Sequence, residues 1–328
     1  MVKFVDKFAS SADFDGYDHE SGYQMVPIDG MRTVTVKTDT LAARLSLNLQ
    51  RRAILIGNFR DAGNQPIAGL NTASEFNNDR DFTLPANSTI RFDIKGNQFV
   101  ANAAIDLKEI KVNSDTDITV DASIIVGVKA KITKKTAFVF VSDIRGNIRP
   151  KFDERSIDPR GVLRAASTSY LNQANMELTD IDDGTPIKEM TTAADLGDPI
   201  IVDKEMPKRS KNTSAFIASE VDAKFPGLFA STHFVILLTR RVRSLNSVAV
   251  LDINVRNSQG SNMIFFTPFT SNAEDMHKAL MHEVGHASGA DHNRESRNLM
   301  FPSLDGTTKH ILAEHIEAIH HGGPVFPF

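Results

Sequence analysis

One short stretch of the chain gathers residue types that can bind a metal ion and act on the water beside it. Residues 281–300 read MHEVGHASGADHNRESRNLM and hold three of the chain's ten histidines. His282 and His286 are four positions apart, so on a helix their side chains are neighbours and both imidazoles can reach one cation. Glu283 is rotated off that face, where a carboxylate can act on water without coordinating the metal. The spacing predicts a catalytic metal site.

A third ligand at His292 requires the helix to end before it. On a continuous helix, His292 would point away from His286 and lie too far along the axis. Gly289 can adopt a positive φ without a Cβ penalty, so it can end the helix and turn the chain back. Three neutral nitrogens leave one tetrahedral position for water, which is typical of a catalytic zinc site. We therefore expect the three histidines to bind Zn²⁺.

The plain alternative is a helix with a solvated histidine pair and a chance glutamate, because short HExxH patterns do occur by accident. Gly289 and His292 argue against it. With them, the full pattern should arise by chance on the order of 10⁻⁵ times per chain of this composition. Metal binding is the favoured interpretation.

The chain resembles the metzincin zinc peptidases, because these residues match every fixed position of their long motif, HExxHxxGxxH. Residues 298–302, NLMFP, resemble the Met-turn of that family, and Met300 stands eight residues after His292, as in the matrixin branch. The resemblance is closest to matrixins over residues 282–302. It implies a zinc metalloendopeptidase that hydrolyses a protein or peptide substrate through a metal-bound water activated by Glu283. Met300 would have a structural role as buried packing.

Some features depart from branches of this family, and two alternatives stay open. No tyrosine follows Met300, and the absence of cysteine removes disulfides and the cysteine-switch latency of many matrixins. One alternative is a non-catalytic, metal-binding structural or adhesive protein that keeps a metzincin-like fold, although the intact Glu283 argues against it. The other is a different HExxH class in which Glu314 or Glu317 supplies the third ligand.

Residues 281–300 can bind a metal only if a helix holds the first two histidines, and that helix must be anchored to a sheet. Residues 271–274, SNAE, form a capping box in which the Ser271 oxygen caps the helix, so the helix should start near Asn272. Apolar residues then recur at helical spacing and form a stripe that can pack on a sheet: Met276, Leu280, Val284 and Ala287.

Residues 134–328 have the element order expected of the metzincin-like domain. The strand TAFVFVSD precedes a helix that Asp158 can cap, with Pro159 in its first turn. Three strand candidates follow, and then the metal helix, the Met-turn and a final helix, TKHILAEHIEAIH. We expect a mixed twisted sheet, with the substrate extended along an edge strand, for which SVAVLDINV is the candidate.

Residues 31–133 show strands of period two, such as ARLSLNLQ and TIRFDIKG, separated by turn signals. Strands without intervening helices predict an all-β, sandwich-like domain, either an accessory module or a pro-domain. Residues 1–30 are polar and glycine-containing, which indicates an N-terminal arm. The fold class expected for the whole chain is α+β.

Composition excludes several classes of partner. The 328 residues carry a net charge of -4, which offers no sustained basic field for nucleic acid. No apolar stretch is long enough for a membrane span. Charged residues interrupt the start of the chain, so it lacks the core of a classical signal peptide. The protein either stays inside the cell, is secreted by another route or has been trimmed. The sequence does not indicate its oligomeric state.

Overall fold

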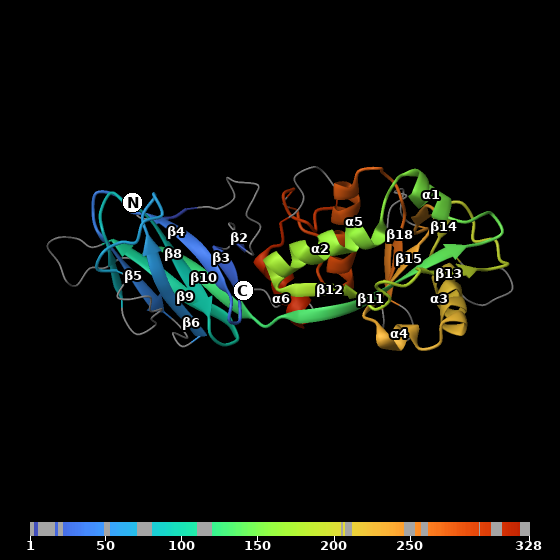
Figure 1. The fold of residues 1–328 in the computed structure, drawn as a ribbon, viewed down its shortest axis with the longest axis horizontal. Coiled ribbons are helices and arrows are strands. Elements are labelled where there is room, and N and C mark those ends of the chain that lie inside the picture. Colours follow the sequence, from blue (N-terminus) through green and yellow to red (C-terminus); the bar gives the residue numbers. More distant parts are fainter. Residues whose placement is uncertain are drawn as a thin grey trace. The chain divides into compact units, whose positions relative to one another are not determined.

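The computed structural model describes residues 3–5, 17–18, 22–48, 53–70, 81–109, 120–204, 206, 212–245, 253–256, 262–294, 296–302 and 310–321. They fall into two compact units. The first comprises residues 1–131, 172–175 and 311–320, and the second comprises residues 132–171, 176–310 and 321–328. The described part is a mixed α+β protein, mostly sheet, with six helices (Figure 1).

The first unit contains two sheets. The four-stranded sheet has the order β1 (Lys3–Phe4), β4 (Met31–Lys37), β8 (Thr89–Gly96) and β6 (Ile54–Arg60). The six-stranded sheet has the order β2 (Tyr17–Asp18), β3 (Tyr23–Pro27), β10 (Val120–Lys129), β9 (Val100–Glu109), β5 (Ala43–Asn48) and β7 (Phe82–Leu84). All pairings are antiparallel except that of β3 with β10.

Alternating residues of both sheets fill one hydrophobic core. Ile90, Phe92 and Ile94 of β8 are fully buried and belong to the same cluster as Leu45 and Leu47 of β5. Two sheets that share one core in this way form a sandwich. The period of two in the sequence therefore reports the buried face of each strand correctly.

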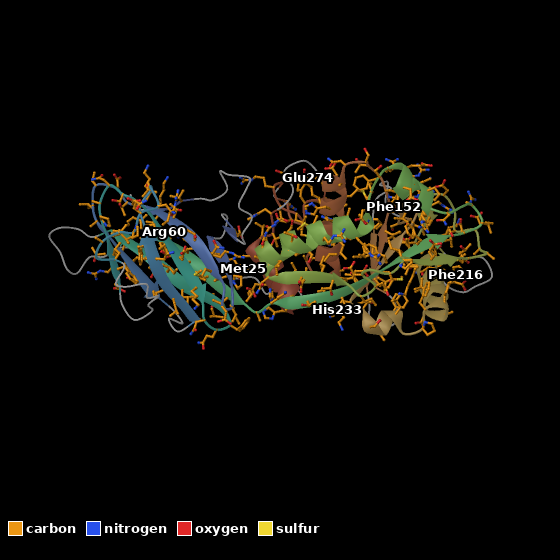
Figure 2. All side chains as sticks on the ribbon, in the orientation of Figure 1. Met25, Arg60, Phe152, Phe216, His233 and Glu274 are labelled. Atoms are coloured by element: carbon orange, nitrogen blue, oxygen red, sulfur yellow. The ribbon has the colours of Figure 1, made fainter. Side chains whose placement is uncertain are left out.

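Part of the segment expected to be a polar arm is β-structure instead. Within residues 1–30, β1, β2 and β3 all belong to the two sheets. Met25 on β3, which Figure 2 labels, is fully buried. β3 has no strand signal of period two, because residues 23–26 are all buried and show no alternation. Residues 6–16 and 19–21 of the expected arm lie outside the described residues.

The second unit is built on one sheet with the order β12 (Met176–Asp180), β11 (Ile132–Ser142), β15 (Phe234–Leu238), β18 (Asn262–Phe266) and β17 (Ile253–Arg256). The pairings are parallel until the edge, where β17 runs antiparallel to β18. All five residues of β15 are buried, as expected for a central parallel strand covered on both faces. Smaller pairings add β13 (Lys188–Thr191) beside β11, and β14 (Ile200–Ile201) with β16 (Val242–Arg243).

Helices complete the second unit: α1 (Arg149–Glu154), α2 (Pro159–Ala174), α3 (Thr213–Lys224), α4 (Leu228–Ser231) and α5 (Ala273–Ala287). The predicted start of α2 is confirmed, because Asp158 Oδ1 accepts the Arg160 N–H at 3.0 Å and Pro159 is the first helical residue. None of the described helices is long and apolar enough to cross a membrane.

The last helix, α6 (Ala313–His321), differs from its sequence assignment. Residues 311–320 group with the first unit, as do residues 172–175 at the end of α2. The element order predicts one domain of residues 134–328 that includes this helix, but a helix that follows the metal motif in the chain need not group with it.

Candidate metal centre

Helix α5 starts and packs as predicted, apart from its cap. The cap is Asn272, whose Oδ1 accepts the Glu274 N–H at 3.0 Å, and not Ser271. Met276, Leu280 and Val284 are fully buried, and α5 packs against β17 and β18. The apolar stripe therefore anchors this helix to the sheet.

A sharp turn ends α5 where the sequence predicts it. Gly289 has a φ of 100°. The Gly289 N–H donates to the His286 carbonyl at 3.0 Å, and the Ala290 N–H donates to the Gly285 carbonyl at 3.0 Å. These two bonds make a Schellman motif, in which a glycine at positive φ satisfies the last carbonyls of a helix. The chain then reverses and brings His292 back to the helix.

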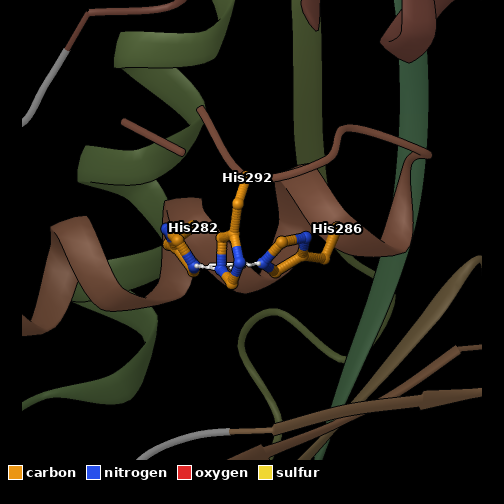
Figure 3. Close-up of side chains that lie close together, drawn as sticks. All are labelled: His282, His286 and His292. Carbon is orange, nitrogen blue, oxygen red and sulfur yellow. Dashed lines mark hydrogen bonds between the residues drawn. The ribbon is translucent and has the colours of Figure 1, made fainter. Parts of the chain in front are cut away.

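The three predicted ligands converge. The Nε2 atom of His286 lies 3.0 Å from that of His282 and 3.1 Å from that of His292, and the remaining pair is 3.3 Å apart. Figure 3 shows the three rings pointing toward one another. In a tetrahedral zinc site with bonds of about 2.0–2.1 Å, ligand nitrogens are about 3.3–3.4 Å apart. The observed spacing matches that within a few tenths of an ångström, so the trio can hold a metal ion.

Hydrogen bonds at the far side of two rings select the ligand form. His282 Nδ1 lies 2.8 Å from the Leu299 carbonyl, and His286 Nδ1 lies 2.8 Å from the Ala290 carbonyl. A carbonyl only accepts, so each Nδ1 carries a proton, and in the neutral form of each ring the lone pair is then at Nε2. Two such lone pairs 3.0 Å apart repel unless a cation lies between them. Metal-ligating histidines usually donate their other N–H in this way.

Burial also favours the neutral ring. Burial lowers the pKa of His286 below its usual value, and the nearby His292 lowers it further. His282 is buried, His286 is half-buried and His292 is exposed. The trio thus has one protected side and one side that solvent can reach.

The turn at residues 298–300 contacts helix α5 beside the histidine ligands. Met300 is buried, and a Cβ added at Gly285 would lie 2.5 Å from its Sδ. The Asn298 side chain accepts the Met300 N–H at 2.5 Å, and the Met300 carbonyl accepts the Asn293 N–H at 3.0 Å. Met300 is thus buried packing, as predicted, and the same turn aims the Leu299 carbonyl at His282.

Sequence reasoning missed Gly285 and Tyr170. Tyr170 is fully buried on α2, and its hydroxyl donates to the Met281 carbonyl at 2.5 Å, next to the first ligand. Burial, and then the charge of Glu283, raise the pKa of this tyrosine well above its usual value, so it stays neutral. The glycine carried a usable signal, since a glycine inside a helix costs stability unless something needs the space.

The three glutamates considered for the site lie in different places. Glu283 is half-buried on α5, beside His282 in the chain. Glu317 binds Lys129 at 2.5 Å, and Glu314 lies 3.3 Å from His315. Among the described residues, the cluster able to hold a metal is the histidine trio, and neither Glu314 nor Glu317 belongs to it.

Comparisons with known proteins add little to this picture. No protein-family model matches the chain, and no curated protein matches it. Among solved structures, CBD12 from CALX1.2 is similar at 17% identity over 37% of this chain and 48% of that one, with a TM-score of 0.20. A family 123 glycoside hydrolase from Clostridium perfringens is similar at 7% identity over 81% and 52%, with a TM-score of 0.17. The chain spans about half the length of each, and these scores are too low to indicate a shared fold.

Proposed function

We propose that this protein is a zinc-dependent endopeptidase of the metzincin kind. One observation carries the proposal: three Nε2 atoms converge at 3.0–3.3 Å while two of the rings donate Nδ1–H to backbone carbonyls. That donor set suits a divalent cation held by nitrogen and leaves room for further ligands. Zinc is the first choice, because it accepts three neutral imidazoles in tetrahedral geometry.

Glu283 is the proposed catalytic residue. It follows His282 directly, so its side chain leaves the helix about 100° away from the ligand face. A zinc ion held by the trio would supply Lewis acidity to water and to the scissile carbonyl. The Glu283 carboxylate takes a proton from the attacking water and delivers it to the leaving amide nitrogen. The water oxygen adds to the carbonyl carbon first, and the carbon–nitrogen bond then breaks as the nitrogen receives the proton, so no covalent enzyme intermediate is required.

The edge of the sheet is the proposed place for the substrate. Among the described strands, β17 pairs only with β18 and ends the order of its sheet, and an edge strand of this kind can add an extended peptide. Helix α5 packs against this strand and against β18, which brings the ligand helix close to the same edge. The described strand covers Ile253–Arg256, and residues 247–252 of the expected strand lie outside the described residues.

The test compares the parent protein with Glu283→Ala on a library of unstructured peptides. We expect the parent to cleave internal peptide bonds and the variant to lose activity by at least about 100-fold, in line with general acid–base catalysis. Both proteins should retain stoichiometric zinc. Equal residual activity in the two zinc-loaded proteins would defeat the enzyme proposal and favour a non-catalytic metal protein of structural or adhesive function.

A further inference from the structure

The outer face of the four-stranded sheet in the first unit is positively charged. Val34 and Val36 of β4 and Phe92 of β8 belong to the hydrophobic core, so the residues that alternate with them point away from that core. Within the four described strands, five of the outward residues are cations: Lys3, Lys37, Arg60, Arg91 and Lys95. The two lysines at one end of the face are exposed, and the other three cations are half-buried. The chain as a whole carries a net charge of -4, so these positive charges are concentrated on one surface.

The strand register places like charges beside each other. Lys3 on β1 is paired with Lys37 on β4, and Arg60 on β6 is paired with Arg91 on β8. Like charges directly opposite each other on neighbouring strands destabilise a sheet. An anion bound over the face would offset this repulsion, so the arrangement favours a negatively charged partner.

One carboxylate lies on the same face, and donors of the sheet already engage it. Asp93 Oδ1 accepts from Arg60 Nη2 and from Thr33 Oγ1, both at 2.6 Å. Its other oxygen accepts from Asn58 Nδ2. Arg60, which Figure 2 labels, is therefore neutralised by Asp93. Among the described residues, no ion pair involves the other cations of the face, which are Lys3, Lys37, Arg91 and Lys95.

The groups between the cations are hydroxyls and not aromatic rings. Thr35 lies opposite Arg91, and Thr89 lies opposite Lys37. The outward positions of the four described strands hold no aromatic residue. Single-stranded nucleic acid is bound largely by stacking its bases on aromatic rings, and the major groove of a duplex admits a helix or a two-stranded ribbon. A flat face of four strands without aromatic rings offers neither contact.

Two other anionic partners also fit this face poorly. Its outward apolar residues are Met31 and Leu55, which are too few to bury in a membrane interface. An acidic peptide gains most by pairing its backbone with an edge strand, whereas the backbone groups within the sheet are already paired. Cations interleaved with hydroxyls instead suit a polymer that carries both anionic groups and hydroxyls. An anionic polysaccharide has both.

We propose that the outer face of the four-stranded sheet binds a linear anionic polysaccharide that carries sulfate or carboxylate groups. The anionic groups accept charge-assisted hydrogen bonds from Lys3, Lys37, Arg91 and Lys95, and the threonine hydroxyls bond to hydroxyls of the sugar. The stretch of β8 from Thr89 to Lys95 is about 20 Å long, so the polymer contacts the face over more than one of its repeating units. This site lies within the first unit and does not depend on the proposed peptidase activity.

The test measures the affinity of the full-length protein for two polysaccharides over a range of salt concentrations. Heparin presents sulfate groups, and polygalacturonate presents only carboxylates. The variant Lys37→Gln/Arg91→Gln removes two cations from the face. The matched control is Arg44→Gln/Lys108→Gln, because these two cations lie opposite each other on β5 and β9, on the outer side of the six-stranded sheet. Both double variants remove the same charge and relieve like-charge pairs, so both should keep the parental stability.

We expect the parent to bind at least one of the two polysaccharides, with an affinity that falls as salt rises. The Lys37→Gln/Arg91→Gln variant should bind about 10-fold more weakly or worse, and its slope of log affinity against log salt should decrease by about two, one for each cation lost. The control should stay within about 2-fold of the parent near 0.15 M salt, where distant charges are screened. The polysaccharide that binds identifies sulfate or carboxylate as the group recognised.

A parent that binds neither polysaccharide at low salt would overturn the proposal. Equal losses in the two double variants would also overturn it, since net charge and not this face would then govern binding. Tighter binding of the parent to polyglutamate, oligothymidylate or phosphatidylserine vesicles than to either polysaccharide would assign the face to a different partner and refute the proposal in the same way. If the double variant does not fold, Arg91→Gln alone, with Arg44→Gln as its control, decides between these outcomes.

Discussion

The closest packing at the metal centre predicts an unusual response to alanine at Gly285. A Cβ there would lie 2.5 Å from the Met300 Sδ, 3.2 Å from its Cε and 3.3 Å from the Tyr170 hydroxyl. Glycine to alanine inside a helix normally stabilises by about 0.5–1 kcal/mol. Overpacking a buried site costs about 1–3 kcal/mol. The difference between the two is a net loss of up to about 2.5 kcal/mol, and we expect Gly285→Ala to lower the free energy of unfolding by about 1 kcal/mol, reversing the usual sign.

Zinc affinity should fall in the same variant. Met300 belongs to the turn at residues 298–300, and the Leu299 carbonyl of that turn lies 2.8 Å from His282 Nδ1. Outer-shell disturbances of this kind weaken metal binding by about 10–100-fold. The assays are urea unfolding of the zinc-free protein and chelator competition for the metal.

Gly161→Ala is the matched control, because Gly161 also lies inside a helix, α2. The nearest atom to its added Cβ is the Asp158 Oδ2 at 2.9 Å, at the end of a side chain that is 61% exposed, caps the helix through its Oδ1 and can yield toward solvent. This control should gain stability or stay neutral. In a Met300→Ala background, Gly285→Ala should also become stabilising by about 0.5–1 kcal/mol. A gain in the parent background that matches the control would refute the packing argument.

Two further predictions concern the ligand set and the pH dependence of stability. His292→Ala should weaken zinc binding by more than about 100-fold, beyond the effect of an outer-shell change, and chelator competition would show it; unchanged affinity would mean that His292 is not a ligand. At Asp143, burial alone would raise the pKa, but hydrogen bonds from Arg240 and from the Leu196 and Arg145 N–H groups bring it below its usual value. A lowered carboxyl pKa stabilises the fold above the unfolded pKa of about 3.9, and this contribution is lost as the pH falls through the folded pKa. Urea unfolding should therefore show a smaller loss of stability below about pH 4 for Arg240→Met than for the parent, and equal slopes would contradict the assignment.

The metal centre could be predicted from the sequence because its rules are local. The i, i+4 spacing of His282 and His286 needs only helix geometry, and the role of Gly289 needs only the permissive φ of glycine. The structure agrees on both, with the rings converging and Gly289 at a φ of 100°. The cap was missed by one residue, since Ser271 and Asn272 are both good caps and only the backbone path decides between them.

Long-range partners could not be predicted. Nothing local in YQMVP shows that β3 runs parallel to β10, about 100 residues later, because parallel pairing leaves no alternating pattern when both faces are covered. The same holds for α6. Its apolar face was predicted, and the residues of that face are all buried: Ile311, Leu312, Ile316 and Ile319. Helical periodicity predicts that these residues are buried, but it does not predict which surface they pack against.

The support of the histidines explains why so short a motif is sufficient to specify the site. Both of the Nδ1–H groups with assigned partners donate to main-chain carbonyls, those of Ala290 and Leu299. Any side chain that preserves the two turns supplies the same carbonyls, so these positions need no fixed residue type. A particular residue type is needed instead at the positions that make the turns possible. Gly289 is needed for its positive φ, Gly285 for the space beside Met300, and Asn298 for the bond to the Met300 N–H. Sequence patterns therefore report the ligands and the glycines, while the atoms that set the tautomers become visible only in the fold.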